Sequence, residues 1–389
     1  MKRSSIAATV LAFTPLLLGP AAPAQSMEDL NLQIHGYATQ GFLYTTKNNI
    51  FTTNSSDGSP AWTEAVVNIG AQPTPKLRLT VQARYSLLGN YGNTITLDYA
   101  AADLKENDHF GVRFGKVKTP WGLFNEIQDI DPSYLWALLP QSIYPTTSSN
   151  AILAHYGGVV YGKLRFSSQL GQIEYRGFGG EGIYGTDDGY FVDQAEAGFN
   201  LPHGIEGPIY GGALHWKTPL PGLMVGASYL TDTRWSAAYT ASRAAASGTQ
   251  TLAANSQPNY FALYEKDKLM VAYEYSRSWG DTSTQFPGAP ASFLRNDDRS
   301  WYAMASYKIT GKFTAGLYDS QNSDHQAPLG PKRYQKDLAL SCRYDFSQFL
   351  YAKVEQHFIE GTGLDYDNNL NPNLQPTTRL TALKLGVSF

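Results

Sequence analysis

The chain has little that points to sulfur chemistry or to helices in a membrane. Cys342 is its only cysteine, which excludes a disulfide framework. Cys342 lies on the apolar face of an expected strand and is interpreted as an inert hydrophobe rather than a reactive thiol. Charged residues make up only 16 % of the sequence. No run of eighteen apolar residues follows residue 24, so no transmembrane helix is encoded there.

Motifs for catalysis and metal binding are also missing. There is no G-x-S-x-G and no phosphate-binding loop, and the seven histidines lack zinc-ligand spacing. The alternating Asp and Asn residues of 365–373 suggest calcium. However, Leu370 and Pro376 stand where an EF-hand needs Gly and Glu. A polar loop is the favoured interpretation and a weak cation site the alternative, so we expect no cofactor.

The first 24 residues have the three-part layout of a secretory signal peptide. Lys2 and Arg3 precede an apolar stretch, and small residues at 22–24 form an A-x-A cleavage site. Without this segment, 28 basic residues stand against 33 acidic ones, since Lys2 and Arg3 belong to the 30 basic residues of the whole chain. The sequence therefore has no basic field, and a nucleic-acid partner is not expected.

Residues 25–389 are rich in the elements of a β-barrel. The whole chain has 26 tyrosines and 36 glycines, all but one of these residues beyond position 24. Segments such as 76–88 alternate strictly, with Leu79 and Val81 on one face and Arg78 and Arg84 on the other. Recurring alternation in an exported chain predicts an all-β fold, a transmembrane antiparallel up-and-down barrel of about sixteen strands. Fourteen or eighteen strands remain alternatives.

Connections between the expected strands alternate between short and long. Short ones lie at 73–75, 217–222 and 266–268, whereas 232–257 and 279–298 are expected to be long. This asymmetry is typical of outer-membrane barrels, which have short periplasmic turns and long outer loops. A lumen of this size is too wide for side chains to fill, which predicts an aqueous channel.

The chain ends on an apolar strand, "LKLGVSF" at 383–389. A barrel has no free edge, so this strand must pair with the first strand near 32–44. Its terminal Phe389 resembles the signature by which Gram-negative barrels are handed to their assembly machinery. That resemblance rests on Leu383, Leu385, Val387 and Phe389.

The longest connection, 119–156, carries Trp121, Phe124 and Trp136 and is expected to pack inside the barrel rather than to be disordered. The runs "GKVKTPWGLFNE" at 115–126 and "LLPQSIYP" at 138–145 resemble the constriction-loop region of Gram-negative outer-membrane porins. The phosphate-selective type is the most similar. The motif residues are Lys116, Lys118, Pro120 and Gly122. The resemblance implies a trimeric pore whose third outer loop folds inward. The lysine and arginine clusters of phosphate channels are not clearly present, so phosphate selectivity is not implied.

Opposed charges are expected at the waist of such a channel. The predicted constriction residues are Arg78, Arg84, Arg113, Lys118, Glu126, Asp129 and Asp131. Acids facing bases across a narrow waist would create a transverse field that sorts solutes by charge. Alternatively, the arginines only pair with the acids and pin the loop, and the two interpretations are compatible.

The sequence thus favours an outer-membrane porin for passive diffusion of small hydrophilic solutes and ions, with a mild anion preference. Its expected partners are outer-membrane lipid, two further copies in a homotrimer and the assembly machinery. The alternatives are a lipase-like barrel enzyme and a structural or adhesive barrel. An enzyme would need a serine beside a histidine such as His35 or His357, and the sequence identifies no such serine.

Overall fold

The computed structural model describes residues 30–148, 153–185, 199–200, 204–241, 246–364, 366–367 and 369–389. The expected signal segment, 1–24, lies outside the described residues. Within them, no helix has both the length and the apolar character needed to cross a membrane.

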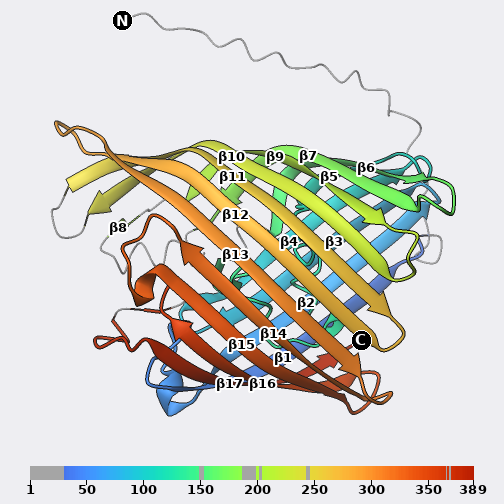
Figure 1. Ribbon diagram of the computed structural model, residues 1–389. Helices are drawn as coiled ribbons and strands as arrows, with labels where there is room; N and C mark the ends of the chain where they lie inside the picture. The colour runs from blue at the N-terminus through green and yellow to red at the C-terminus, as the bar shows by residue number, and fades with distance from the viewer. Residues whose placement is uncertain are drawn as a thin grey trace, which may run out of the picture.

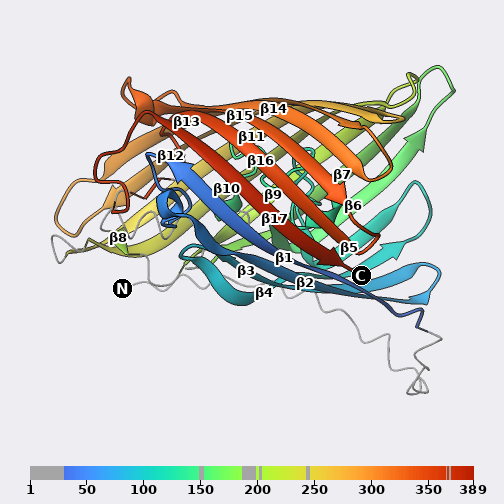
Figure 2. The same ribbon diagram turned by 90° about the horizontal axis from the view of Figure 1, so that it is seen from below.

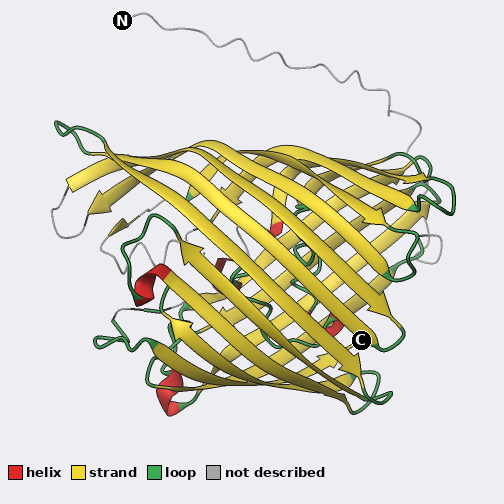
Figure 3. Ribbon diagram, in the orientation of Figure 1, coloured by secondary structure: helices red, strands yellow, loops and turns green. Residues whose placement is uncertain are grey.

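Sixteen long strands of the described chain close into one antiparallel barrel (Figures 1 and 3). Each strand pairs with its neighbours in sequence, apart from the two-residue β8, which pairs only with the outer end of β10. The strands are β1 (Gln33–Thr46), β2 (Ser59–Thr74), β3 (Leu77–Leu88), β4 (Tyr91–Lys105), β5 (Gly111–Lys118), β6 (Ala154–Arg165), β7 (Gln172–Tyr184), β8 (Phe199–Asn200), β9 (Ile205–Lys217), β10 (Leu223–Ala241), β11 (Ala246–Lys266), β12 (Leu269–Gln285), β13 (Ser292–Lys308), β14 (Phe313–Asp324), β15 (Tyr334–Asp345), β16 (Leu350–Gly361) and β17 (Thr377–Ser388). The described helices are single 3-10 turns, η1 (Ser55–Asp57), η2 (Asp131–Ser133), η3 (Thr146–Ser148) and η4 (Pro331–Arg333).

The barrel is closed by β1 and β17, which lie side by side near the C-terminus in Figure 2. Tyr37 pairs with Ser388, and Phe389 extends the ladder by exchanging two backbone hydrogen bonds with Gly36, at 2.9 and 3.1 Å. The ring of Phe389 lies over Gly36, where a Cβ would stand 2.7 Å from it. The prediction that the last strand pairs with the first is confirmed, and a glycine makes room for the terminal aromatic ring.

Side chains alternate between the two faces of the wall, as the barrel prediction requires. On β3, Gln82 and Arg84 are buried on the inner face, whereas Leu79 and Val81 are exposed on the outer face. Large apolar side chains exposed in this way recur on strands around the whole barrel. An outer surface of this composition is typical of contact with lipid.

The pairing of β4 with β3 has two register shifts, and the one in the middle of the strand changes the face of the residues around it. Gln82 pairs with Tyr99 and Ala83 pairs with Leu97, so Asp98 is an extra residue in a β-bulge. A bulge reverses the faces of the residues that follow it. Strict alternation would place Tyr99 beside Leu97 on the apolar face, but the Tyr99 hydroxyl accepts a hydrogen bond from inward-facing Asn68 at 2.6 Å.

Two connections that were expected to be long are mostly strand. The 232–257 region lies largely within β10 and β11, and the 279–298 region lies largely within β12 and β13. The prediction of long loops there was wrong because polar residues in an extended hairpin still form a complete backbone ladder. The connection between β5 and β6 runs from residue 119 to 153, three residues shorter than expected.

Phe389→Asp is expected to lower the amount of assembled barrel several-fold, because it removes the ring from Gly36 and puts a charge on the lipid-facing side. Ser388→Asp is the control, since it adds the same charge one residue away on the opposite face of β17. Heat-modifiable barrel in isolated membranes is the measurement. Equal levels of the Phe389→Asp variant and the wild type would contradict the prediction.

Candidate functional site: the loop across the barrel

The described part of the connection between β5 and β6, residues 119–148, is bound to the inner faces of strands around the barrel. The Trp121 indole donates to the carbonyl of Gln257 on β11 at 3.0 Å. Further along the loop, Arg343 on β15 donates to the carbonyl of Pro132 at 2.7 Å, and the Tyr37 hydroxyl on β1 donates to that of Asp129 at 2.7 Å. Because these strands belong to opposite parts of the wall, the loop crosses the barrel interior.

One anchor of the loop is the buried carboxylate of Glu274 on β12. It accepts hydrogen bonds from the hydroxyls of Tyr144 and Tyr302, the amide of Asn259 and the backbone N–H of Leu123. Gly122 has a φ of +64°, and a Cβ there would lie 2.7 Å from Glu274 Oε1. Glycine at position 122 of the sequence motif is therefore required by the close approach of the loop to Glu274.

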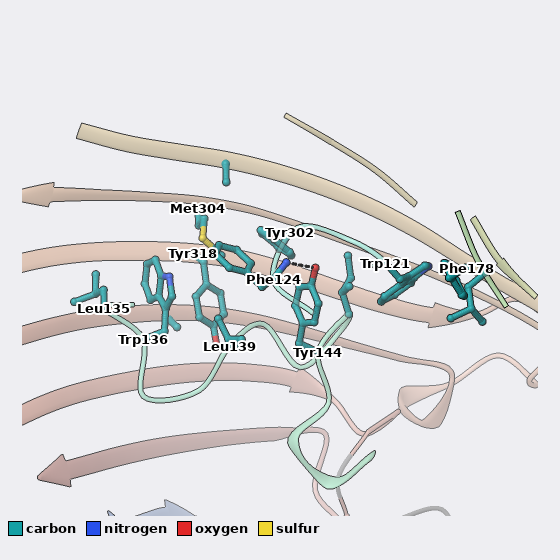
Figure 4. Packing of buried hydrophobic residues seen from close by; sticks show 14 of the residues in the cluster. Trp121, Phe124, Leu135, Trp136, Leu139, Tyr144, Phe178, Tyr302, Met304 and Tyr318 are labelled. Atoms are coloured by element: carbon teal, nitrogen blue, oxygen red, sulfur yellow. Dashed lines mark hydrogen bonds between the residues drawn. The ribbon is translucent and has the colours of Figure 1, made fainter. Parts of the chain in front are cut away.

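An aromatic cluster packs the loop against β12, β13 and β14 (Figure 4). Phe124 and Trp136 of the loop are buried, and the Trp136 ring lies edge-on to Tyr318 with 5.2 Å between centroids. Figure 4 shows Phe124 beside Tyr144, whose hydroxyl accepts the Phe124 backbone N–H at 2.9 Å. The aromatic surface that the loop buries fixes it against the inner face of the wall.

The second anchor is Asp131, at the start of η2. Its carboxylate accepts hydrogen bonds from Lys384 Nζ at 2.8 Å and the Tyr351 hydroxyl at 2.7 Å, and it lies 3.0 Å from Lys353 Nζ. Burial alone raises the pKa of Asp131, but the two ammonium groups outweigh burial and hold that pKa well below its usual range. We call Asp131, Tyr351, Lys353 and Lys384 the lysine clasp.

The third anchor is Glu355 on β16. Its two oxygens accept the backbone N–H groups of Ala137 and Leu138 at 2.8 and 3.0 Å. His357 lies behind it, with Nε2 3.2 Å from Glu355 and Nδ1 2.9 Å from Asp337. The buried ring of His357, which sequence analysis had considered for an enzyme, thus lies between two carboxylates.

Four of the predicted constriction residues lie in buried ion pairs. Lys118 pairs with Asp129, which also accepts a hydrogen bond from Gln82. Arg84 pairs with Asp98 at 3.0 Å and with Glu64 at 3.4 Å. Arg84 also lines a cavity that the loop forms with β2, β3 and β17, together with Trp62, Glu64, Tyr134 and Lys384 among others. Asp131 belongs to the lysine clasp.

The other three predicted residues keep solvent contact. The Glu126 carboxylate lies between two guanidinium groups, 3.7 Å from Arg113 and 3.7 Å from Arg176. All three side chains are between 24 and 31 % exposed. Arg113 also forms an ion pair with Asp103 at 3.1 Å. Asp103 is the strand partner of Arg78, whose side chain is exposed. Among the predicted residues that the structure describes, Glu126 and Arg113 form the one pair of opposite charges that keeps access to water.

Sequence reasoning missed the wall residues that complete this arrangement. Arg176 lies on β7 next to Glu174, which in turn pairs with Lys217 at 2.8 Å and Lys163 at 3.6 Å. The signal in β7 was short, because only Glu174 and Arg176 carry charge at alternate positions of its first half. Lys116 of the motif, by contrast, lies outside the lumen, with its ammonium group over the outward-facing ring of Tyr156.

No family model and no curated protein matches the chain. Solved structures do match over nearly its whole length. The anion-selective porin of Comamonas acidovorans has 9 % identity and a TM-score of 0.54, with 92 % of this chain and 99 % of that one covered. The outer membrane channel DcaP of Acinetobacter baumannii has 10 % identity and a TM-score of 0.56, with 94 % and 99 % covered. The chain has the porin fold. OmpT of Vibrio cholerae, in its trimer form, shares this fold at 13 % identity and a TM-score of 0.53, with 92 % and 99 % covered.

The resemblance to the phosphate-selective type of porin rests only on the sequence motif at 115–126. Of its two lysines, Lys118 binds the loop and Lys116 lies on the outer face. Neither motif lysine therefore supports selectivity for phosphate in the lumen.

Proposed function

We propose that this protein is an outer-membrane channel through which small hydrophilic solutes and ions diffuse passively. The porin fold supports it, as does a wall that is apolar outside and charged inside. The observation that carries the proposal is the solvent-exposed contact of Glu126 with Arg113 and Arg176, where a loop in the lumen faces a charged wall. A Gram-negative outer membrane is the location that such a barrel fits.

The proposed constriction consists of Glu126 and the nearby wall residues. The wall contributes Arg78, Arg113, Lys163, Arg176 and Lys217 on the basic side and Asp103 and Glu174 on the acidic side. Basic groups outnumber acidic ones there even after Glu126 is included, which favours a mild preference for anions. Asp129, Asp131 and Lys118 serve instead to hold the loop.

The test is single-channel recording of the purified protein in planar bilayers under a salt gradient. A channel gives discrete conductance steps and a reversal potential shifted toward the chloride equilibrium. A barrel that only anchors loops gives no steps. Ester hydrolysis assayed on the same detergent-solubilised sample would reveal a barrel enzyme.

The proposed assembly is a homotrimer in contact with outer-membrane lipid, inserted through recognition of Phe389. The trimer form of OmpT supports this assembly by fold alone. Light scattering of the protein–detergent complex measures it directly, and a monomer mass would contradict it.

A further inference from the structure

Two arginines face outward from neighbouring strands at the edge of the apolar band. Arg277 on β12 and Arg299 on β13 are direct strand partners. Below them on β12, Leu269, Val271 and Tyr273 are exposed on the same face. The partners Tyr275 and Trp301 come next, and then the two arginines, on the side toward the β12–β13 connection. A guanidinium in this position lies where the hydrocarbon of a bilayer gives way to its head groups.

The two guanidinium groups are held together by one carboxylate. Asp297 accepts from Arg277 Nε at 2.6 Å and Nη2 at 3.0 Å, and from Arg299 Nη2 at 3.0 Å. Asp297 is nearly covered, whereas the arginine side chains are 38 and 42 % exposed. Two positive charges share one negative charge, so the group carries a net charge of about +1.

The geometry orders the arginines without using all of their donors. Asp297 takes up the Nε and Nη2 groups, which leaves the Nη1 edges directed away from it. Arg277 is further fixed by the Trp279 ring, 4.8 Å from its guanidinium carbon, and Trp279 is itself exposed on the outer face. Planar guanidinium groups arranged in this way suit the oxygens of a phosphate group.

We infer that Arg277 and Arg299 form a binding site for the phosphate of a membrane lipid head group, with Trp279 and Trp301 against the sugar or acyl region of that lipid. The site lies on the outside of the barrel, separate from the lumen. The inference rests on the proposed membrane location but not on conduction. A negative result for lipid binding would therefore leave the proposed channel function intact, and the reverse also holds.

The experiment uses the full-length protein, immobilised in neutral, phosphate-free detergent and titrated with bis-phosphorylated lipid A in mixed micelles of the same detergent. Dephosphorylated lipid A with the same acyl chains is the reference ligand. Wild-type protein is expected to bind the phosphorylated form about tenfold more tightly, as charge-assisted arginine contacts allow. Arg277→Gln with Arg299→Gln is expected to abolish this difference, and the double Lys variant to keep part of it.

Arg295→Gln is the matched control, because Arg295 pairs with Asp281 one step further from the apolar band. It should bind as the wild type does. Heat-modifiable migration of all variants in electrophoresis verifies that the barrel is folded. Equal binding of the two lipids by the wild type, or wild-type binding by the double Gln variant, would overturn the site. Displacement by inorganic phosphate at the lipid's own concentration would also overturn it, since that would indicate a free-anion site.

Discussion

Replacing Asp131 with Asn is expected to free part of the loop and make the channel wider and noisier. The Asp131 carboxylate is fully buried and is held by Lys353, Lys384 and Tyr351. An amide has the same size but no charge, so two buried ammonium groups lose their shared counter-ion. Removing one partner from a buried ion pair costs about 3–5 kcal/mol. Because the barrel wall is closed without the loop, the loss should fall on loop docking rather than on the barrel.

Two measurements report this release. Single-channel records should show higher mean conductance with more open-state noise. Chymotrypsin should cut the folded variant within 119–153, a stretch rich in Trp, Phe, Tyr and Leu. The control is Asp108→Asn, which removes the same charge from an exposed turn where Asp108 pairs with Lys105 and Arg165. A variant at position 131 that conducts and resists chymotrypsin like the wild type would show that the clasp does not hold the loop.

Fold and wall orientation could be predicted because they depend on a local pattern. The two-residue alternation places Leu79 outside and Arg84 inside from sequence alone, and the structure agrees. Closure between β1 and β17 follows because an unpaired edge in lipid leaves backbone groups unsatisfied. The barrel fold could therefore be predicted from the sequence.

The partners of individual charges could not be predicted, because they depend on contacts between distant segments. Asp131 lies more than 200 residues from both lysines of its clasp, and nothing in the local sequence links them. The bulge at Asp98 likewise has no sequence signal of its own, and neither does the ion pair of Asp98 with Arg84. Sequence alone placed Arg84 at the constriction with Arg78 and Arg113, whereas the structure buries it between two carboxylates.

The same distinction predicts which arginines control ion selectivity. Arg113 and Arg176 are partly exposed on either side of Glu126, so a passing ion feels their charge through partly watery surroundings. At a few ångströms and an effective dielectric constant of about 20, each charge contributes on the order of 1 kcal/mol after screening by salt. Arg84 is neutralised at close range by Asp98 and Glu64, so its field at the constriction is weak.

Arg113→Ala combined with Arg176→Ala is therefore expected to reduce the preference for anions several-fold and to move the reversal potential toward the cation side. Glu126→Gln should move it in the opposite direction, because it removes the acid that the two arginines share. Arg84→Ala should change the reversal potential little but lower the stability of the barrel, since it leaves two buried carboxylates without their cation. Arg295→Ala, which removes an exposed arginine on the same outward face of β13 as Arg299, is the control for loss of charge alone. The measurement is the zero-current potential across a tenfold salt gradient. If the double variant matches the wild type while Arg84→Ala shifts the potential, the constriction lies at the cavity beside β2 and β3 instead of at Glu126.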